Sequence, residues 1–259
     1  MQVDRTAAAG KHVFMEKPFT LDIKSAESAL GAVARAGVVL GVGYSRRFHP
    51  AMVELKARVK GGRLGLVSHC ESAQTAPAGV FMSKDSWRAD PEEAPAGAMT
   101  AIGVHTIDAT IYLFDRIDEV YCTSLRRVMA RLEDTTCVIL GLANGMSGSL
   151  FCSLITTVTN RFAVSGTKGR VEIAAPSLEF RFTPVPEAPL TGRHAAPEPE
   201  IIDYKGFDAL RAELEGFAAA INGERAFPIT AEEVLHGVAV FEAIVRSVAL
   251  HRPVKVANR

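Results

Sequence analysis

Four strand-like segments follow one another between Ile117 and Ile173, with no helical segment among them. Asn144-Gly145, between the second and the third, is a strong signal for a β-hairpin turn. Consecutive strands joined by short turns pair antiparallel, whereas parallel strands need long crossover connections. This half of the chain therefore predicts a large, mainly antiparallel sheet.

The first part of the chain has a different pattern. An apolar segment is followed by a helical pattern over residues 21–37, between a candidate N-cap at Asp22 and a stop at Gly37, and a second strand-like and a second helical segment come next. Strand, helix, strand, helix is typical of a parallel α/β layer. We therefore predict an α/β plus α+β fold, with an incomplete Rossmann-like parallel layer over residues 1–63. An α/β domain with a large open sheet is predicted over residues 64–259.

Two segments rich in Pro, Gly and polar residues divide the second part of the chain further. Residues 76–97 and 183–206 are rich in these residue types and are predicted to be loops. An apolar helical segment follows the first loop at residues 98–114. Two more helices, over residues 207–222 and 230–250, are predicted to close the chain and to pack back on its first part.

Composition excludes several classes of function. Lys+Arg and Asp+Glu both number 29, which argues against a surface made for nucleic acid or anionic membrane. No apolar run approaches the roughly 20 residues that span a bilayer, and the N-terminus lacks a signal-peptide core. We therefore expect a cytoplasmic protein. No Cys-x-x-Cys pair exists, which indicates buried reduced thiols and neither a zinc nor a redox motif at Cys70, Cys122, Cys137 and Cys152.

The segment "LGVGYSRRF" is similar to a dinucleotide fingerprint but lacks its third glycine. Gly41 and Gly43 follow a strand, yet Arg46 stands where the last glycine allows close packing of helix on strand. No clear acidic residue ends a following strand about 20 residues on. We interpret the two glycines as easing a turn, and the chain contains no dinucleotide fingerprint.

Six motifs then occur in one order along the chain: "GKHVFMEKPF", "GYSRRFHP", "WR", "GAMTAIGVHTID", "SGTKGRVEI" and "FPITAEEVLHGVAVFEAIVRSVALHRPVKV". The series resembles the Gfo/Idh/MocA oxidoreductases, the relatives of glucose–fructose oxidoreductase and inositol dehydrogenase. This resemblance implies a Rossmann domain, a second domain with an open sheet, and NAD- or NADP-dependent hydride transfer to or from a sugar or cyclic polyol. It also implies that βαβ units with a glycine loop precede the E-K-P strand. We therefore expect this chain to lack them and to bind the cofactor weakly.

The E-K-P motif supplies a candidate acid or base. Lys17 follows a strand, at the edge where α/β sheets bind ligands, and a lysine with a lowered pKa can take or give the proton of an alcohol. Pro18 restricts the backbone of Lys17, and Glu16 is placed to hold the lysine or a ribose hydroxyl. With the resemblance, we predict Lys17 as catalytic and substrate-binding, and all three residues as cofactor-binding.

His105 is the second predicted catalytic and substrate-binding residue. The resemblance implies an aspartate four residues before this histidine, on the same helix face, but Ala101 stands there. Asp108 shares the face of His105 and is predicted either to bind substrate or to serve helix packing. His105 and Asp108 alone lack the third protein ligand that zinc chemistry requires, so no metal site is predicted.

Further contacts are predicted around these residues. The resemblance implies that the pair Trp87-Arg88 meets the nicotinamide end of the cofactor, since guanidinium suits phosphate or carboxamide oxygens. Arg46 is predicted to reach cofactor or substrate, and Tyr44 to reach substrate. Both remain open to a purely structural reading.

Two other functions and one assembly prediction complete the analysis. A non-catalytic binding or assembly protein that keeps the sheet domain is the main alternative, and a metal-dependent lyase or isomerase is a remoter one. Apolar alternation in "TTCVILGLA" and "SLFCSLIT" indicates apolar groups on both sheet faces. The resemblance implies that the open face pairs with another subunit, so we expect a homodimer or homotetramer, with a small sugar or polyol as the other partner.

Overall fold

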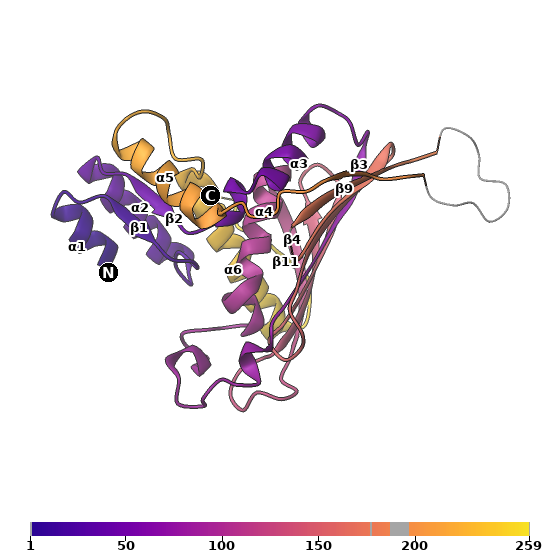
Figure 1. Ribbon diagram of the computed structural model, residues 1–259. Helices are drawn as coiled ribbons and strands as arrows, with labels where there is room; N and C mark the ends of the chain where they lie inside the picture. Colours follow the sequence, from indigo (N-terminus) through magenta and orange to yellow (C-terminus); the bar gives the residue numbers. More distant parts are fainter. Residues whose placement is uncertain (1, 177, 187–196, 259) are drawn as a thin grey trace.

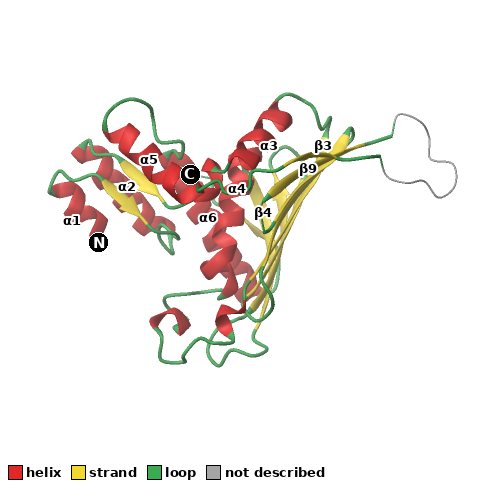
Figure 2. Ribbon diagram, viewed as in Figure 1, coloured by secondary structure: helices red, strands yellow, loops and turns green. Residues whose placement is uncertain are grey.

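The computed structural model describes residues 2–176, 178–186 and 197–258. Within these ranges it holds a two-stranded sheet and a nine-stranded sheet. Figure 1 shows the small sheet with its helices beside the large, twisted sheet, and Figure 2 shows that the helices lie on one side of the latter. This confirms the predicted fold class, a small parallel layer joined to a large and mainly antiparallel sheet.

The small sheet pairs β1 (Val13–Met15) in parallel with β2 (Leu40–Val42). Helix α2 (Ile23–Ala36) connects them, and α1 (Gln2–Ala8) packs on α2. The ends of α2 lie where the sequence predicts them. The side chain of Asp22 accepts a hydrogen bond from the backbone of Ser25, and Gly37 ends the helix at φ 63°, a conformation that glycine adopts without strain.

The large sheet has the strand order β10-β9-β8-β7-β3-β6-β5-β4-β11. Its strands are β3 (Val67–Thr75), β4 (Ile117–Leu125), β5 (Thr135–Leu142), β6 (Ser147–Ser153), β7 (Thr159–Gly166), β8 (Gly169–Ala174), β9 (Glu179–Pro184), β10 (Glu200–Ile202) and β11 (Val254–Lys255).

Strand β3 occupies the middle of this sheet and has one neighbour in each direction. It runs antiparallel to β7 and parallel to β6, and His69 pairs with Ser165 on one side and Ser147 on the other. The remaining neighbouring strands pair antiparallel. The large sheet thus differs from a simple antiparallel meander at one place, where β3, from an earlier part of the chain, pairs in parallel with β6.

One face of the large sheet is covered by α3 (Pro50–Lys60), α4 (Val104–Phe114) and α6 (Ala231–Leu250) (Figure 1). A π-helical turn, η4 (Met99–Gly103), leads into α4. The buried side chains of α3 belong to the same apolar cluster as those of the large sheet. Helix α3, which we assigned to the first domain, thus packs against the second, while the division at residues 63 and 64 stays a prediction.

Helix α6 joins the two parts of the molecule. Val234 and Val238, near its start, lie in the apolar cluster of the small sheet, whereas Val240 and Ile244 lie in that of the large sheet. Helix α5 (Ala209–Ile221) also packs on the first part, where the ring of Phe217 lies 5.3 Å from that of Phe14, centroid to centroid. Both C-terminal helices therefore return to the first part of the chain, as the sequence predicts.

Several local expectations need correction. The first predicted loop carries two short 3-10 turns, η2 (Pro77–Gly79) and η3 (Trp87–Ala89). The second predicted loop overlaps the end of β9 and contains β10, which pairs with β9. Part of that loop, residues 187–196, lies outside the described residues. Cys137 is exposed on the uncovered sheet face, whereas the other three cysteines are buried as predicted.

Candidate functional site

The site forms where the end of β1 meets the start of α4. Lys17 follows β1 by two residues, and its bond to Pro18 is cis. Its Nζ donates a hydrogen bond of 2.6 Å to the carbonyl oxygen of Ala101 in η4. The structure thus brings the lysine of the first part onto the helix of the second, 84 residues on in the sequence.

His105 lies in the first turn of α4, beside the same junction. Its Nδ1 is buried and has no hydrogen-bond partner among the described residues. The ring of Tyr44 meets the imidazole edge to face, with centroids 6.1 Å apart. Burial lowers the pKa of His105 to about 3, and the charges of Lys17 and Arg46 add to the effect. The imidazole is therefore neutral at pH 7, so one ring nitrogen can donate and the other can accept a hydrogen bond.

Lys17 is held in surroundings that favour its neutral form. Burial lowers the pKa of its amine, the charge of Glu16 raises it, and the charges of Arg88 and Arg46 lower it again. The net direction is downward from 10.5. A partly buried amine with a lowered pKa is suited to accept a proton from an alcohol or return one to a carbonyl.

Arg46 projects from η1 (Ser45–Phe48) to the large sheet. Its Nη2 donates to Oδ1 of Asn160, at the start of β7, over 2.9 Å. The side-chain amide of Gln74 satisfies its neighbours when its oxygen faces Arg46 and accepts a hydrogen bond from the guanidinium. In this orientation the amide nitrogen donates to Ile102 O and Thr106 Oγ1. Sequence reasoning missed Gln74 and Asn160, because single polar residues at strand ends carry no distinctive pattern.

The neighbouring Arg47 turns to the opposite side and enters the core. It binds both carboxylate oxygens of Asp108 over 2.7–3.1 Å and donates from Nη1 to Glu233 over 2.8 Å. Burial raises the pKa of Asp108 to about 6 against the pull of Arg47, so the pair is ionised at neutral pH. The structure therefore places Asp108 in an ion pair, and its predicted contact with substrate stays a prediction.

Trp87 and Arg88 lie in η3, on the loop before η4. The Trp87 side chain is 63% exposed, and the Arg88 guanidinium stacks 4.3 Å from the centroid of its ring. The charge of Arg88 reaches Lys17, since it contributes to the lowered pKa of that amine. Trp87 turns a large aromatic surface to solvent, and the predicted contact of the pair with the cofactor stays a prediction.

The described residues near Lys17 offer little to hold the phosphates of a dinucleotide. Glu16 lies beside Gly43 at the adjoining ends of β1 and β2, where open α/β sheets bind ligands. A Cβ at Gly41 would collide with the rings of Phe14 and Phe217, so this glycine serves ring packing. Among the described residues, no glycine-rich turn leads into an α-helix to hold a pyrophosphate.

The N-terminus of α2 follows E-K-P and is occupied by carboxylates. Asp22 binds Ser25 N, and Oε2 of Glu242 on α6 accepts from Ile23 N over 3.0 Å. Two negative charges at a helix N-terminus oppose the binding of a phosphate there. This helix end therefore offers no site for a phosphate, and the predicted cofactor contacts of Glu16, Lys17 and Pro18 stay a prediction.

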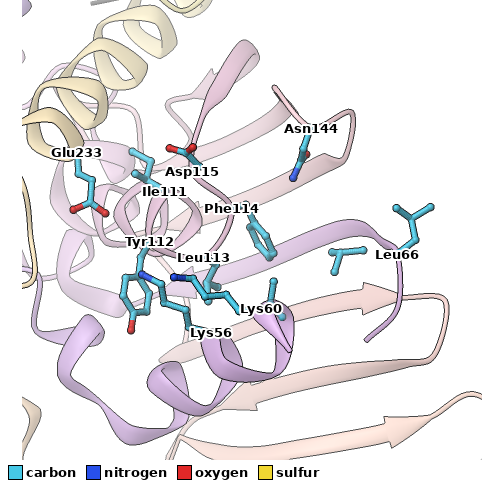
Figure 3. Close-up of a pocket in the computed structure, with 12 residues that line it drawn as sticks. Lys56, Lys60, Leu66, Ile111, Tyr112, Leu113, Phe114, Asp115, Asn144 and Glu233 are labelled. Atoms are coloured by element: carbon cyan, nitrogen blue, oxygen red, sulfur yellow. The ribbon is translucent and has the colours of Figure 1, made fainter. Parts of the chain in front are cut away.

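Other features lie away from this junction. Within the described ranges, no group of three or more His, Cys, Asp or Glu residues is arranged to hold a metal ion. Figure 3 shows a cavity of about 550 Å³ at the far end of α4, where Lys56 Nζ lies 3.7 Å from the ring centroid of Tyr112. None of the described helices is both long and apolar enough to cross a membrane.

Comparisons with known proteins agree with this arrangement. A family model described as "Oxidoreductase family, NAD-binding Rossmann fold" of the GFO/IDH/MocA group matches residues 2–44, and the model of the GFO/IDH/MocA C-terminal domain matches residues 52–172. The inositol 2-dehydrogenase of Rhizobium meliloti (strain 1021) is 27% identical over 98% of this chain and 76% of its own. The uncharacterized oxidoreductase YrbE of Bacillus subtilis (strain 168) is 26% identical over 99% and 74%.

Solved structures show the same fold over nearly the whole chain. The aldose-aldose oxidoreductase from Caulobacter crescentus, solved in complex with glycerol, has a TM-score of 0.81 and 26% identity, and the match covers 98% of this chain and 75% of that one. An NAD binding oxidoreductase from Klebsiella pneumoniae reaches a TM-score of 0.85 at 20% identity, covering 99% and 77%. The chain belongs to the GFO/IDH/MocA family of NAD-binding oxidoreductases.

Proposed function

We propose that the protein transfers a hydride between a nicotinamide cofactor and a sugar or cyclic polyol. The observation that carries the proposal is the hydrogen bond of Lys17 to Ala101 in η4, the turn that leads into α4, beside His105, whose buried Nδ1 has no partner among the described residues. The relatives named inositol 2-dehydrogenase and aldose-aldose oxidoreductase support this class of substrate.

Each residue has a separate role in this proposal. The neutral amine of Lys17 accepts the proton of the substrate hydroxyl during oxidation and returns it to the carbonyl oxygen during reduction. The neutral imidazole of His105 orients that hydroxyl through a hydrogen bond, and Tyr44 fixes the ring. A bound nicotinamide supplies the hydride acceptor or donor, with Trp87 and Arg88 at its open side.

Lys17→Met tests the catalytic role. We expect it to lower kcat by roughly 10²- to 10⁴-fold, the usual contribution of a general acid or base, while sugar binding measured by calorimetry changes little. Lys24→Met, on the exposed face of α2, is the matched control and should leave kcat unchanged. Wild-type kcat in Lys17→Met would remove Lys17 from the mechanism.

The pH profile gives an independent readout. Because burial lowers the pKa of Lys17, kcat/KM for alcohol oxidation should rise with pH and level off at an apparent pKa below 10.5. Lys17→Met should lose this limb of the profile. A limb that persists in the variant belongs to another group.

Cofactor binding is expected to be weak in the 259-residue chain. The residues that suit the nicotinamide end are present, but the N-terminus of α2 carries Asp22 and Glu242, which oppose a phosphate. Turnover assays therefore need NAD+ or NADP+ at high concentration. Tight binding of either cofactor by this chain, measured by calorimetry, would contradict this account of the site.

The carboxylates at the N-terminus of α2, which oppose a cofactor phosphate, favour a second candidate function, a non-catalytic binding or assembly protein. In that case the protein would bind polyols, but no NADH or NADPH would form at any cofactor concentration. Formation of either reduced cofactor with a polyol substrate excludes this alternative.

We also infer that the uncovered face of the large sheet pairs with a second copy of the chain. Strands β4 and β5 expose Tyr121, Leu125 and Ile139 on this face, whereas the charged residues of β3, β7 and β8 neutralise one another. Ile139→Lys should convert a dimer or tetramer to a smaller species in light scattering. Leu210→Lys, at an exposed apolar position of α5, should not.

A further inference from the structure

One cation of the candidate site, Arg46, has no ion pair among the described residues. Lys17 binds a backbone carbonyl, and across the described residues no carboxylate forms an ion pair with Arg46. Asp108 is engaged by Arg47 through both oxygens, and Glu16 is exposed to solvent. Arg46 is therefore a cation of this junction that forms no ion pair with a described carboxylate.

Arg46 is the cation whose surroundings are hardest to explain without a ligand. It is partly buried, and its guanidinium donates hydrogen bonds to the neutral amide oxygens of Asn160 and Gln74. A buried charge is normally paired, because removal from water costs more than neutral hydrogen bonds return. The planar fork of a guanidinium matches a carboxylate, which makes two parallel hydrogen bonds with it.

The position of Arg46 assigns the missing anion to the substrate side of the site. Asn160 begins β7 and Gln74 lies near the end of β3, so the guanidinium is anchored on the large sheet and not on the small sheet that carries Glu16. Ala101 stands next to Lys17, where the family resemblance implies an aspartate. A methyl group there removes a negative charge that would repel an anionic substrate.

We propose that the substrate is a sugar acid, whose carboxylate binds Arg46 while one of its hydroxyl groups is presented to Lys17 and His105. This rests on the proposed oxidoreductase function and narrows its substrate class. The carboxylate is bound and not altered, since oxidation takes place at the carbon that bears the presented hydroxyl.

A matched pair of ligands tests this proposal. D-gluconate and D-sorbitol share their carbon chain and differ at C1, which is a carboxylate in the first and a hydroxymethyl group in the second. Calorimetry on the 259-residue protein, with and without NAD+, should show gluconate binding at least about tenfold more tightly, as expected for one charge-assisted contact. Arg46→Gln should abolish this preference, while Arg225→Gln, at an exposed position between α5 and α6, should keep it.

Three results would overturn the proposal. They are equal binding of gluconate and sorbitol, a preference for gluconate that persists in Arg46→Gln, and the absence of gluconate binding at millimolar concentration. Inorganic phosphate serves as a third probe. If it binds as tightly as gluconate and also depends on Arg46, the residue serves any anion, including a cofactor phosphate, and the sugar-acid assignment is wrong.

The outcomes separate this proposal from the proposed function. Gluconate binding that depends on Arg46, without formation of NADH or NADPH, keeps the substrate class and rejects the oxidoreductase. Oxidation of neutral polyols alone, with no preference for gluconate, keeps the oxidoreductase and rejects the substrate class.

Discussion

Removal of the Asp108 carboxylate should destabilise the fold more than most single substitutions. Asp108→Ala deletes three of the five hydrogen bonds that Arg47 makes and leaves its guanidinium buried with a side-chain exposure of 1%. Breaking one partner of a buried ion pair costs about 3–5 kcal/mol. Since Glu233 still binds Arg47, we expect a loss near 3 kcal/mol, equivalent to a fall in Tm of roughly 6–12 °C.

Urea unfolding followed by far-UV circular dichroism measures this loss. Fluorescence is a poor probe, because the one tryptophan, Trp87, is largely exposed in the folded protein. The double variant Arg47→Met/Asp108→Leu is the control, and it should lie within about 1 kcal/mol of the wild type, since apolar side chains can replace a buried ion pair. A loss in the double variant as large as in Asp108→Ala would refute the reasoning, because the cause would then be packing and not an unpaired charge.

Three further stability predictions follow from buried groups and helix ends. Burial raises the pKa of Glu213 from 4.5 to about 7, so the folded state loses stability as the pH rises from 4.5 to 7. Glu213→Gln should therefore raise the free energy of unfolding by at most about 3 kcal/mol above pH 7 and leave it unchanged near pH 4, as measured by urea titration. A gain that does not depend on pH would contradict this. Gly97→Ala should lower the free energy of unfolding by more than about 2 kcal/mol, because φ is 42° and the new Cβ would collide with the carbonyl of Glu133. A Tm equal to that of the wild type would be inconsistent with this backbone conformation. Thr230→Ala removes the capping box of α6 and should cost about 1 kcal/mol by the same titration, whereas Thr230→Ser should cost little, and equal losses would exclude the cap as the cause.

The order of helices and strands could be predicted from the sequence because each rests on local signals. Asp22 and Gly37 bound α2 as expected, and Asn144-Gly145 turns between β5 and β6. The neighbours of β3 could not be predicted, since no local periodicity states which distant strand it pairs with. Strands β9 and β10 were missed because prolines dominate the stretch that joins them.

The candidate site shows the same division between local and distant information. E-K-P and His105 could be singled out, and the structure brings them together through the contact of Lys17 with Ala101. In "SRRF", however, Arg46 turns to the sheet and Arg47 to the core, and nothing in the sequence separates the two. Their environments are set by Asn160 and Asp108, which lie 114 and 61 residues further along the chain.

The central position of β3 has a consequence for how the protein is made. His69 pairs with Ser147 and Ser165, so β3 leaves the ribosome roughly 80 residues before either neighbour has been synthesised. Closing loops of this length is slow, whereas β4 to β6 and β7 to β9 can each form from local hairpins. Until both are complete, β3 presents two unpaired edges to solvent or to a chaperone. We expect its insertion between them to be the late step that limits the rate of folding.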